Sequence, residues 1–268
     1  QASADHVVVL PPGLNASRKA IADAELDILY FTDIGMVPLT YFLAYARLAP
    51  VQVTTWGHPL TSGIPNVDHF LSMDLAEPEG AGAQYSETLV RLPGLTTCYE
   101  RPLPPPAAAC DRARFGFPAG RTIYLCPQSL FKLHPTFDAM LGRILAGDPD
   151  GEIALLAGGQ GRWTELLRVR LARSLPREAV ERIRFVPRVA PDDFLALLAA
   201  ADVILDPTIF CGGNTTLESL AMGTPVVTLP SPYLRGRLTL AMYRRMEFPD
   251  LVARDADDYV RIALSLGR

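Results

Sequence analysis

The stretch Ile204-Leu-Asp-Pro-Thr-Ile-Phe-Cys-Gly-Gly-Asn-Thr-Thr-Leu-Glu-Ser-Leu-Ala-Met-Gly-Thr-Pro-Val-Val-Thr-Leu229 decides the fold class. Its first residues belong to the short apolar run at 203–205, which is typical of a buried parallel strand. The glycine pair at 212–213 allows a sharp turn, and the cap-type residues 214–216 precede the apolar positions of a helix. Gly223-Thr-Pro225 ends that helix, and residues 226–229 form the next strand. The pattern therefore predicts strand, glycine turn, helix, turn and strand.

The glycine turn at 212–213 has a possible chemical use. It leads into a helix N-terminus, where backbone N–H groups are unpaired and small hydroxyl side chains stand beside them. Such a terminus binds diphosphates well. A capped turn without any ligand is an equally good interpretation of the glycine turn taken alone.

Composition bounds the class of protein. The chain has 268 residues, of which 49% are apolar, so it can form two modest domains or one large α/β domain. The net charge of -4 argues against a general nucleic-acid binder. No apolar run reaches membrane-spanning length, so no membrane partner is expected. The four cysteines have neither C-x-x-C nor disulfide-rich spacing, which favours reduced thiols in a cytoplasmic protein.

The first part of the chain alternates strand and helix patterns. Strands are predicted at 6–10, 26–31, 51–56, 70–73 and 88–92, and helices at 15–24 and 38–48. The run Arg101-Pro-Leu-Pro-Pro-Pro-Ala-Ala-Ala109 is too proline-rich for a helix or a central strand. We therefore predict a domain over 1–98, a proline-rich linker over 99–120 and a second domain over 121–268.

The second domain is more regular. Strands are predicted at 123–126, 153–157 and 183–186, and helices at 135–145, 164–174, 192–201 and 255–267, around the segment quoted first. Strand–helix repeats of this length predict a parallel, doubly wound α/β sheet. Ligands of such sheets bind beyond the carboxyl ends of the strands.

The loops after these strands hold the candidate binding residues. Lys132 stands just before a helix, where its ammonium can neutralise phosphate, although a plain surface lysine is the commoner case. Gly158-Gly-Gln160-Gly161 is a flexible loop or a simple turn. Pro187-Arg-Val189-Ala190 can offer backbone groups to a planar base. Glu218 can reach a ribose hydroxyl or can simply favour its helix N-terminus.

One acidic pair resembles a metal motif. Asp148-Pro-Asp150 lies between a helix and a strand and is followed by glycine, at the expected far end of the sheet. We interpret it as a β-turn. No other acidic or histidine cluster has metal-ligand spacing, so no metal site is predicted.

Several separated motifs, taken in order, resemble glycosyltransferase family 41, which includes the O-linked N-acetylglucosamine transferases and the adhesin N-glucosyltransferases. Gly57-His-Pro-Leu-Thr-Ser-Gly63 is similar to the family's G-[HY]-P-x-T-[ST]-G loop, and Gln84-Tyr-Ser-Glu-Thr-Leu89 to its [QC]-[YF]-S-E-x-L segment. Phe131-Lys-x-x-Pro135 resembles the lysine motif, and Cys211-Gly-Gly-Asn-Thr-Thr216 the donor-helix motif. Residues 251–264 are similar to the C-terminal region of the N-glucosyltransferases.

The resemblance implies a GT-B fold, α/β, with two Rossmann-like domains of parallel sheets and a UDP-sugar held by the second. The first domain is expected to be truncated, without the family's upstream histidine and helical, often tetratricopeptide, region. Lys132 would then act on the leaving diphosphate, and the remaining donor-side residues would bind UDP-sugar. These are Gln128, Gln160, Pro187, Val189, Ala190, Gly213, Asn214, Thr215, Thr216 and Glu218. Lysine and helix dipole would supply the positive field without a metal or other cofactor.

On the acceptor side the resemblance implies His58 as base or sugar contact, with Thr61 and Ser62 beside it; a structural histidine is the alternative. We expect an inverting, metal-independent transferase that moves GlcNAc or glucose from UDP to Ser, Thr or Asn of an acceptor protein or peptide. The alternatives are a GT-B transferase acting on a glycan or small molecule, and a non-catalytic nucleotide-sugar-binding module. The sequence leaves the oligomeric state open.

Overall fold

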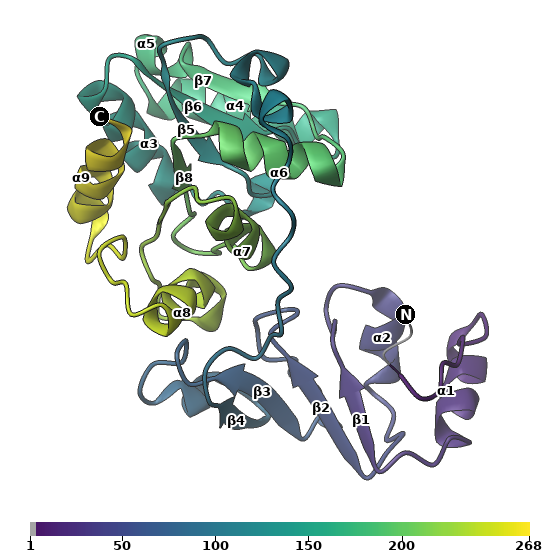
Figure 1. Cartoon of the computed structure of the whole chain (residues 1–268). Coiled ribbons are helices and arrows are strands. Elements are labelled where there is room, and N and C mark those ends of the chain that lie inside the picture. The colour runs from purple at the N-terminus through teal and green to yellow at the C-terminus, as the bar shows by residue number, and fades with distance from the viewer. Residues whose placement is uncertain (1–3) are drawn as a thin grey trace. The chain divides into compact units, whose positions relative to one another are not determined.

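The computed structural model describes residues 4–268 as two compact units, the first ending at Thr96 and the second running over Thr97–Arg268 (Figure 1). The unit boundary therefore lies just before the proline-rich segment. Residues 99–120 belong to the second unit, where they include two 3₁₀ helices, η2 (Ala107–Cys110) and η3 (Arg112–Phe115), which contact α6. Arg112 pairs with Asp202 at 2.5 Å, which helps to hold this segment on the second unit.

The first unit contains a four-stranded parallel sheet in the order β1-β2-β3-β4. Its elements are α1 (Leu14–Ala22), β1 (Ile28–Phe31), α2 (Pro38–Leu43), β2 (Val51–Thr55), β3 (His69–Met73), η1 (Ala81–Gln84) and β4 (Thr88–Leu92). A core that includes Phe31, Ile34, Leu43 and Ile64 joins the helices to the sheet. The predicted strand at 6–10 is wrong. In the described chain β1 pairs only with β2, so residues 7–9 have no sheet to join and are exposed.

The second unit is a doubly wound sheet of five parallel strands in the order β7-β6-β5-β8-β9. The strands are β5 (Thr122–Cys126), β6 (Gly151–Leu156), β7 (Ile183–Val186), β8 (Val203–Leu205) and β9 (Val226–Val227). The helices are η4 (Leu130–Lys132), α3 (Pro135–Gly147), α4 (Gly161–Ser174), α5 (Arg177–Val180), α6 (Pro191–Ala200), α7 (Asn214–Ala221), η5 (Leu234–Gly236), α8 (Leu238–Arg245) and α9 (Ala256–Gly267).

The central strand β5 shows how the two faces of this sheet are covered. Tyr124 and Cys126 pack into a core formed with α3, α4 and α9, whereas Ile123 and Leu125 pack into a second core with α6 and α8. This alternation follows from the two-residue period of a strand and makes three layers, with α3 and α9 on one side and α6 on the other (Figure 1). The chain runs from β5 to β6 and β7 on one side and returns to β8 and β9 on the other. The order reverses between β5 and β8, which is where such sheets bind ligands.

The quoted segment folds largely as predicted. It forms β8, α7 and β9, but α7 begins at Asn214 itself rather than after the residues 214–216, and its N-cap position is Gly213. Because that residue is a glycine, it provides no side-chain cap for the helix. Sequence patterns gave no indication of α8, because the helix is short and follows a proline-interrupted loop. Asp148 and Asp150 lie in a turn, as predicted: the Gly151 N–H donates to the Asp148 carbonyl at 3.2 Å.

Candidate functional site

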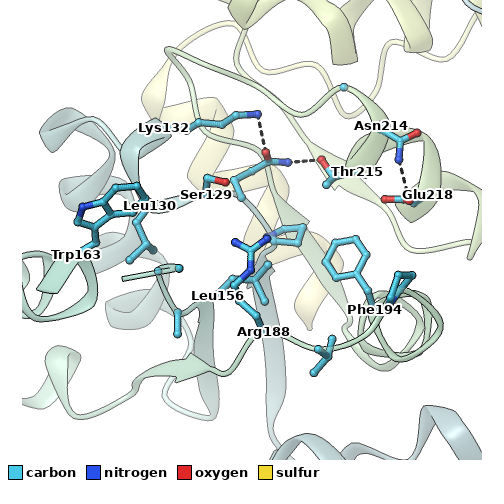
Figure 2. A pocket seen from close by; sticks show the side chains of 18 residues that line it. Ser129, Leu130, Lys132, Leu156, Trp163, Arg188, Phe194, Asn214, Thr215 and Glu218 are labelled. Carbon is cyan, nitrogen blue, oxygen red and sulfur yellow. Dashed lines mark hydrogen bonds between the residues drawn. The ribbon is translucent and has the colours of Figure 1, made fainter. Parts of the chain in front are cut away.

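A pocket of about 490 Å³ opens at the carboxyl ends of the strands in the second unit (Figure 2). Each of four strand-end loops contributes to its lining: the loops after β5, β6, β7 and β8. The predicted site residues that line it are Gln128, Lys132, Val189, Gly213, Asn214, Thr215 and Glu218. The doubly wound topology therefore gathers residues that are far apart in sequence into one place.

Lys132 supplies a positive charge at the edge of this pocket. Its Nζ donates to Gln128 Oε1 at 2.9 Å and to the Cys211 carbonyl at 3.2 Å, and it lies 4.5 Å from the centre of the Phe210 ring. Within residues 4–268 no carboxylate lies within salt-bridge distance of this ammonium. Burial lowers the pKa of Lys132. An ammonium with no anionic neighbour in salt-bridge contact favours an anionic ligand.

Gln128 connects Lys132 to the start of α7. Because an ammonium can only donate, the Gln128 amide must present its oxygen to Lys132 and its Nε2 hydrogens to Thr215 Oγ1 (Figure 2). Thr215 Oγ1 is then an acceptor in this contact, and its own hydrogen is available to the pocket. The N–H groups of Asn214 and Thr215 also have no acceptor within the described residues. All of these donors belong to residues that line the pocket, and N–H groups at a helix N-terminus are suited to phosphate oxygens.

Gly212 makes this arrangement possible. A Cβ atom at that position would lie 2.3 Å from Thr216 Oγ1, 2.8 Å from Gln128 Nε2 and 2.9 Å from Thr215 Oγ1. Any side chain there would displace the polar groups that surround the turn. Gly213 therefore lines the pocket, and Gly212 is required because its neighbours pack too closely for a side chain.

The rest of the lining includes several apolar and aromatic side chains. Trp163 and Leu130 form one side, and Phe194 lies on the other side (Figure 2). The Glu218 carboxylate accepts from Asn214 Nδ2 at 2.8 Å, and burial raises the pKa of this carboxyl, against the effect of that hydrogen bond. A cationic end, apolar and aromatic side chains and one hydrogen-bonded carboxylate match the phosphates, base and ribose of a nucleoside diphosphate.

Four predicted donor-side residues do not line the pocket. Thr216 is buried, and its hydroxyl lies 3.1 Å from that of Thr239, because one helical step turns its side chain toward α8. Gln160 stands exposed at the N-cap of α4, and Pro187 and Ala190 are exposed residues of the loop that carries Val189.

The pocket residues that lay outside the predicted set include Arg188, Trp163 and Phe194. Arg188 belongs to the loop that was predicted to bind the base, and its positive charge could have marked it as a candidate for binding an anion. It is exposed, and it has no hydrogen-bond acceptor or carboxylate partner within residues 4–268. Trp163 and Phe194 lie on helices whose sequence pattern does not mark them as different from core aromatics.

The acceptor-side candidates lie in the first unit, in the loop after β2. The His58 ring packs against Gly35, where a Cβ would lie 2.7 Å from Cδ2. Burial lowers the pKa of His58, and its buried Nδ1 has no partner within the described chain. Thr61 Oγ1 donates to Glu87 at 2.7 Å, and the Ser62 N–H donates to the same carboxylate at 2.7 Å. Glu87 belongs to the second motif of the first domain, and its carboxylate thus holds this loop in place through hydrogen bonds.

No group of three or more His, Cys, Asp or Glu side chains within residues 4–268 is placed to hold a metal ion. None of the helices in this part of the chain combines the length and apolarity needed to cross a membrane.

A doubly wound parallel sheet with a pocket at its switch point defines an α/β ligand-binding domain, here preceded by a second parallel-sheet unit. The model of glycosyl transferase family 41 matches residues 100–268, and the chain belongs to that family. The predicted family is therefore confirmed.

Known proteins of this family resemble the chain over most of its length. It is 30% identical over 223 residues to SPINDLY of Petunia hybrida, named a probable UDP-N-acetylglucosamine–peptide N-acetylglucosaminyltransferase, covering 82% of this chain and 23% of that protein. A lysine-to-methionine mutant of the Thermobaculum terrenum O-GlcNAc transferase superposes with a TM-score of 0.80 at 30% identity, over 97% of this chain and 49% of that one. These matches confirm the GT-B fold class. The chain spans about a quarter of the length of the curated relatives it matches.

A more distant neighbour shares the fold alone. Sucrose-phosphate synthase from Thermosynechococcus elongatus superposes with a TM-score of 0.53 at 16% identity, over 95% of this chain and 74% of that one.

Proposed function

We propose that the protein is an inverting, metal-independent glycosyltransferase that moves GlcNAc or glucose from a UDP-sugar to a side chain of an acceptor protein or peptide. The observation that carries this proposal is that the Lys132 ammonium, which makes no salt bridge within residues 4–268, and the N-terminus of α7 lie in one pocket. The named activities of the SPINDLY and O-GlcNAc transferase relatives support the donor and the acceptor class. The four free cysteines fit a cytoplasmic protein.

The reaction breaks the bond between the anomeric carbon and the β-phosphate oxygen while an acceptor oxygen or nitrogen attacks from the opposite face of the sugar. Negative charge then accumulates on the departing diphosphate. The Lys132 ammonium, the Thr215 hydroxyl and the free N–H groups of α7 stabilise that charge through fixed dipoles and charge. This is the role that a divalent cation has in other transferases, and it gives the reaction a metal-independent route.

The acceptor must lose a proton as it attacks. His58 is the base that we assign, because burial lowers its pKa and leaves the imidazole neutral near pH 7. A neutral imidazole can accept the proton directly. The alternative, a structural histidine packed on Gly35, predicts no effect of this ring on transfer.

The decisive experiment is a calorimetric titration of the 268-residue chain with UDP in the presence of EDTA. We expect binding in the wild type and a loss of roughly tenfold or more in Lys132→Ala, since hydrogen bonds to charged groups contribute about 1.5–3 kcal/mol. Lys19→Ala is the matched control, because Lys19 is an exposed lysine of the first unit that pairs with Asp23. Equal affinity in the Lys132 variant and wild type would contradict the role of Lys132.

Transfer itself is tested with labelled UDP-GlcNAc and UDP-glucose offered in parallel to protein acceptors. We expect His58→Ala to lower kcat for transfer and to leave UDP affinity unchanged. Hydrolysis of the donor in the absence of acceptor distinguishes a transferase from a nucleotide-sugar-binding module, which would release no free sugar.

A further inference from the structure

One peptide group behind the pocket lies between two opposite charges. The Cys211 carbonyl accepts from Lys132 Nζ at 3.2 Å, and the Gly212 N–H donates to Asp206 Oδ1 at 2.7 Å. Both groups belong to the peptide bond that joins Cys211 to Gly212. Its negative end therefore faces the ammonium and its positive end faces the carboxylate, so the peptide dipole is aligned between the two charges and attracted by both.

The Asp206 carboxylate is buried and is held by hydrogen bonds. It is 1% exposed, and its Oδ2 accepts from Thr228 Oγ1 at 2.8 Å. Within residues 4–268 no cation lies within salt-bridge distance of this carboxylate. Lys132 likewise has no carboxylate within salt-bridge distance in this part of the chain. Burial raises the pKa of Asp206 to about 6, and Lys132 acts in the opposite direction. The peptide therefore links the two charges, and its dipole balances each of them in part.

We propose that Asp206 is a positioning residue of the donor site, which acts through the Cys211–Gly212 peptide to hold the Gly212 turn and to keep the Lys132 ammonium charged and directed at the pocket. This inference rests on the proposed function, since it assigns the partner that prepares Lys132 for a diphosphate. Asp206 itself lies behind the turn and does not line the pocket. Its effect on the ligand is therefore indirect.

The groups around this pair allow a clean test by pH. Burial raises the pKa of the Cys126 and Cys211 thiols to about 12, and it raises the pKa of the Tyr243 and Tyr259 phenols well above 10. Cys126 ends β5, Tyr243 lies on α8, and Tyr259 of α9 donates to the Asp206 carbonyl at 3.0 Å. All four stay uncharged between pH 5 and 9. Among the described groups packed around the pair, Asp206 and Lys132 are therefore the ones whose titration the pH profile follows, Asp206 on the acid side and Lys132 on the alkaline side.

The first variant is Asp206→Asn, which keeps the shape of the side chain and an oxygen for the Gly212 N–H but removes the charge. We expect UDP affinity at pH 7.5 to fall roughly tenfold, because the loss of a paired charge leaves the buried ammonium less stable. The alkaline limb of the affinity–pH profile should move to lower pH, since Lys132 then loses its proton more easily. The phosphate of UDP titrates identically with every variant, so only differences between variants count.

Two controls separate positioning from general stability. Asp148→Asn makes the same change at another buried aspartate of this unit, which accepts from the Tyr124 hydroxyl at 2.9 Å. It should lower the thermal midpoint and leave UDP affinity and its pH profile as in wild type. In a Lys132→Met background, Asp206→Asn should have little further effect on affinity, since interacting residues are not additive.

A second variant tests the proposal if Asp206→Asn does not fold. Thr228→Val removes one hydrogen bond that lowers the pKa of Asp206, and it keeps the charge and the bulk. Asp206 then takes up a proton at higher pH, so the acid limb of UDP affinity should move toward neutral. An unchanged acid limb in Thr228→Val would overturn the proposal.

The titrations also separate this proposal from the proposed function. A wild-type chain that does not bind UDP overturns the proposed function itself. Binding in wild type that is equal in Asp206→Asn at every pH overturns only the role of Asp206. A loss that is the same in the Lys132→Met background as in wild type also overturns it, because Asp206 would then act without Lys132.

Discussion

The two units of the chain contain the same kind of sheet and use its carboxyl end in opposite ways. Both sheets are parallel throughout, and in both the hydroxyl-bearing candidates follow a strand. In the first unit, the Thr61 and Ser62 hydroxyls are bound by the Glu87 carboxylate. In the second, the Thr215 hydroxyl accepts from Gln128 and keeps its hydrogen for the pocket.

The charge beside the hydroxyls accounts for this difference. Glu87 is 6% exposed and accepts the hydrogen bonds of Thr61 and Ser62, so these groups of the loop at 57–63 already have a partner within the protein. Lys132 and Arg188 are cations without a carboxylate partner in the described chain, so the second site has unsatisfied attraction for an anion. A shared topology fixes where a site can form, and the loop residues decide whether it binds a charged ligand.

The largest effect should come from closing the space on which the second site depends. Gly212→Ala places a Cβ 2.3 Å from Thr216 Oγ1 and forces the turn or its neighbours to move. We expect UDP affinity to fall by more than tenfold and stability to fall by about 1–3 kcal/mol, as in other overpacked sites. Calorimetry and chemical denaturation measure the two effects. Gly161→Ala, at a glycine with open space around it, should change neither by much; a similar loss in both variants would contradict the argument.

A smaller effect should separate two adjacent threonines. Thr215→Val removes a pocket-facing hydroxyl and should weaken UDP binding by about 1 kcal/mol, or roughly fivefold. Thr216→Val removes a buried hydroxyl that contacts Thr239, so it should lower the thermal midpoint and leave UDP affinity intact. Loss of affinity in the Thr216 variant instead would restore the direct role that the family resemblance implied for it.

Arg188 should contribute less still. Because its guanidinium is exposed, water and salt weaken its attraction for phosphate, and we expect Arg188→Ala to reduce UDP affinity roughly threefold at low salt. The effect should disappear at high ionic strength. Arg173→Ala, which removes the same charge from an exposed residue of α4 outside the pocket, is the control. Equal effects of the two variants would assign the change to net charge.

The sequence predicted the second unit better than the first. Its strands and helices alternate regularly, so the parallel, doubly wound sheet and the four strand-end loops that line the pocket could be predicted from the pattern alone. Residues 6–10 were predicted as a strand because the run is apolar, but a run forms a strand only where another strand pairs with it. No pattern in the sequence reports that pairing.

Individual side-chain directions were harder to predict than loops. Thr215 and Thr216 are the same residue type one position apart, yet a helical step of about 100° separates the pocket from the buried face. Trp163 and Phe194 reach the pocket from helices on which they look like packing residues. The position of a glycine turn follows from local sequence, whereas the direction of a neighbouring side chain depends on which helix packs against it.

The smallest effect on UDP binding is expected from a substitution in the first unit, at Glu87. Glu87→Gln should leave UDP affinity unchanged, because this carboxylate belongs to the first unit. It should loosen the loop at 57–63, since a neutral amide replaces a carboxylate that accepts from Thr61 and Ser62. Hydrogen exchange of the peptides that span this loop should speed up, and Glu79→Gln, at an exposed glutamate of the same unit, should show no such change.

The pH dependence of that loop has a defined sign. Burial acts to raise the pKa of Glu87, but the hydrogen bonds from Ser62 and Thr61 outweigh it and hold the pKa below its usual value of 4.5. The stabilising contribution is therefore present above 4.5 and is lost as the pH falls through the depressed native value. Exchange in the wild-type loop should speed up on acidification through that window, after correction for the intrinsic rate, and the Glu87→Gln variant should lack the step. The same step in the Glu87→Gln variant would contradict the assignment of this pH dependence to Glu87.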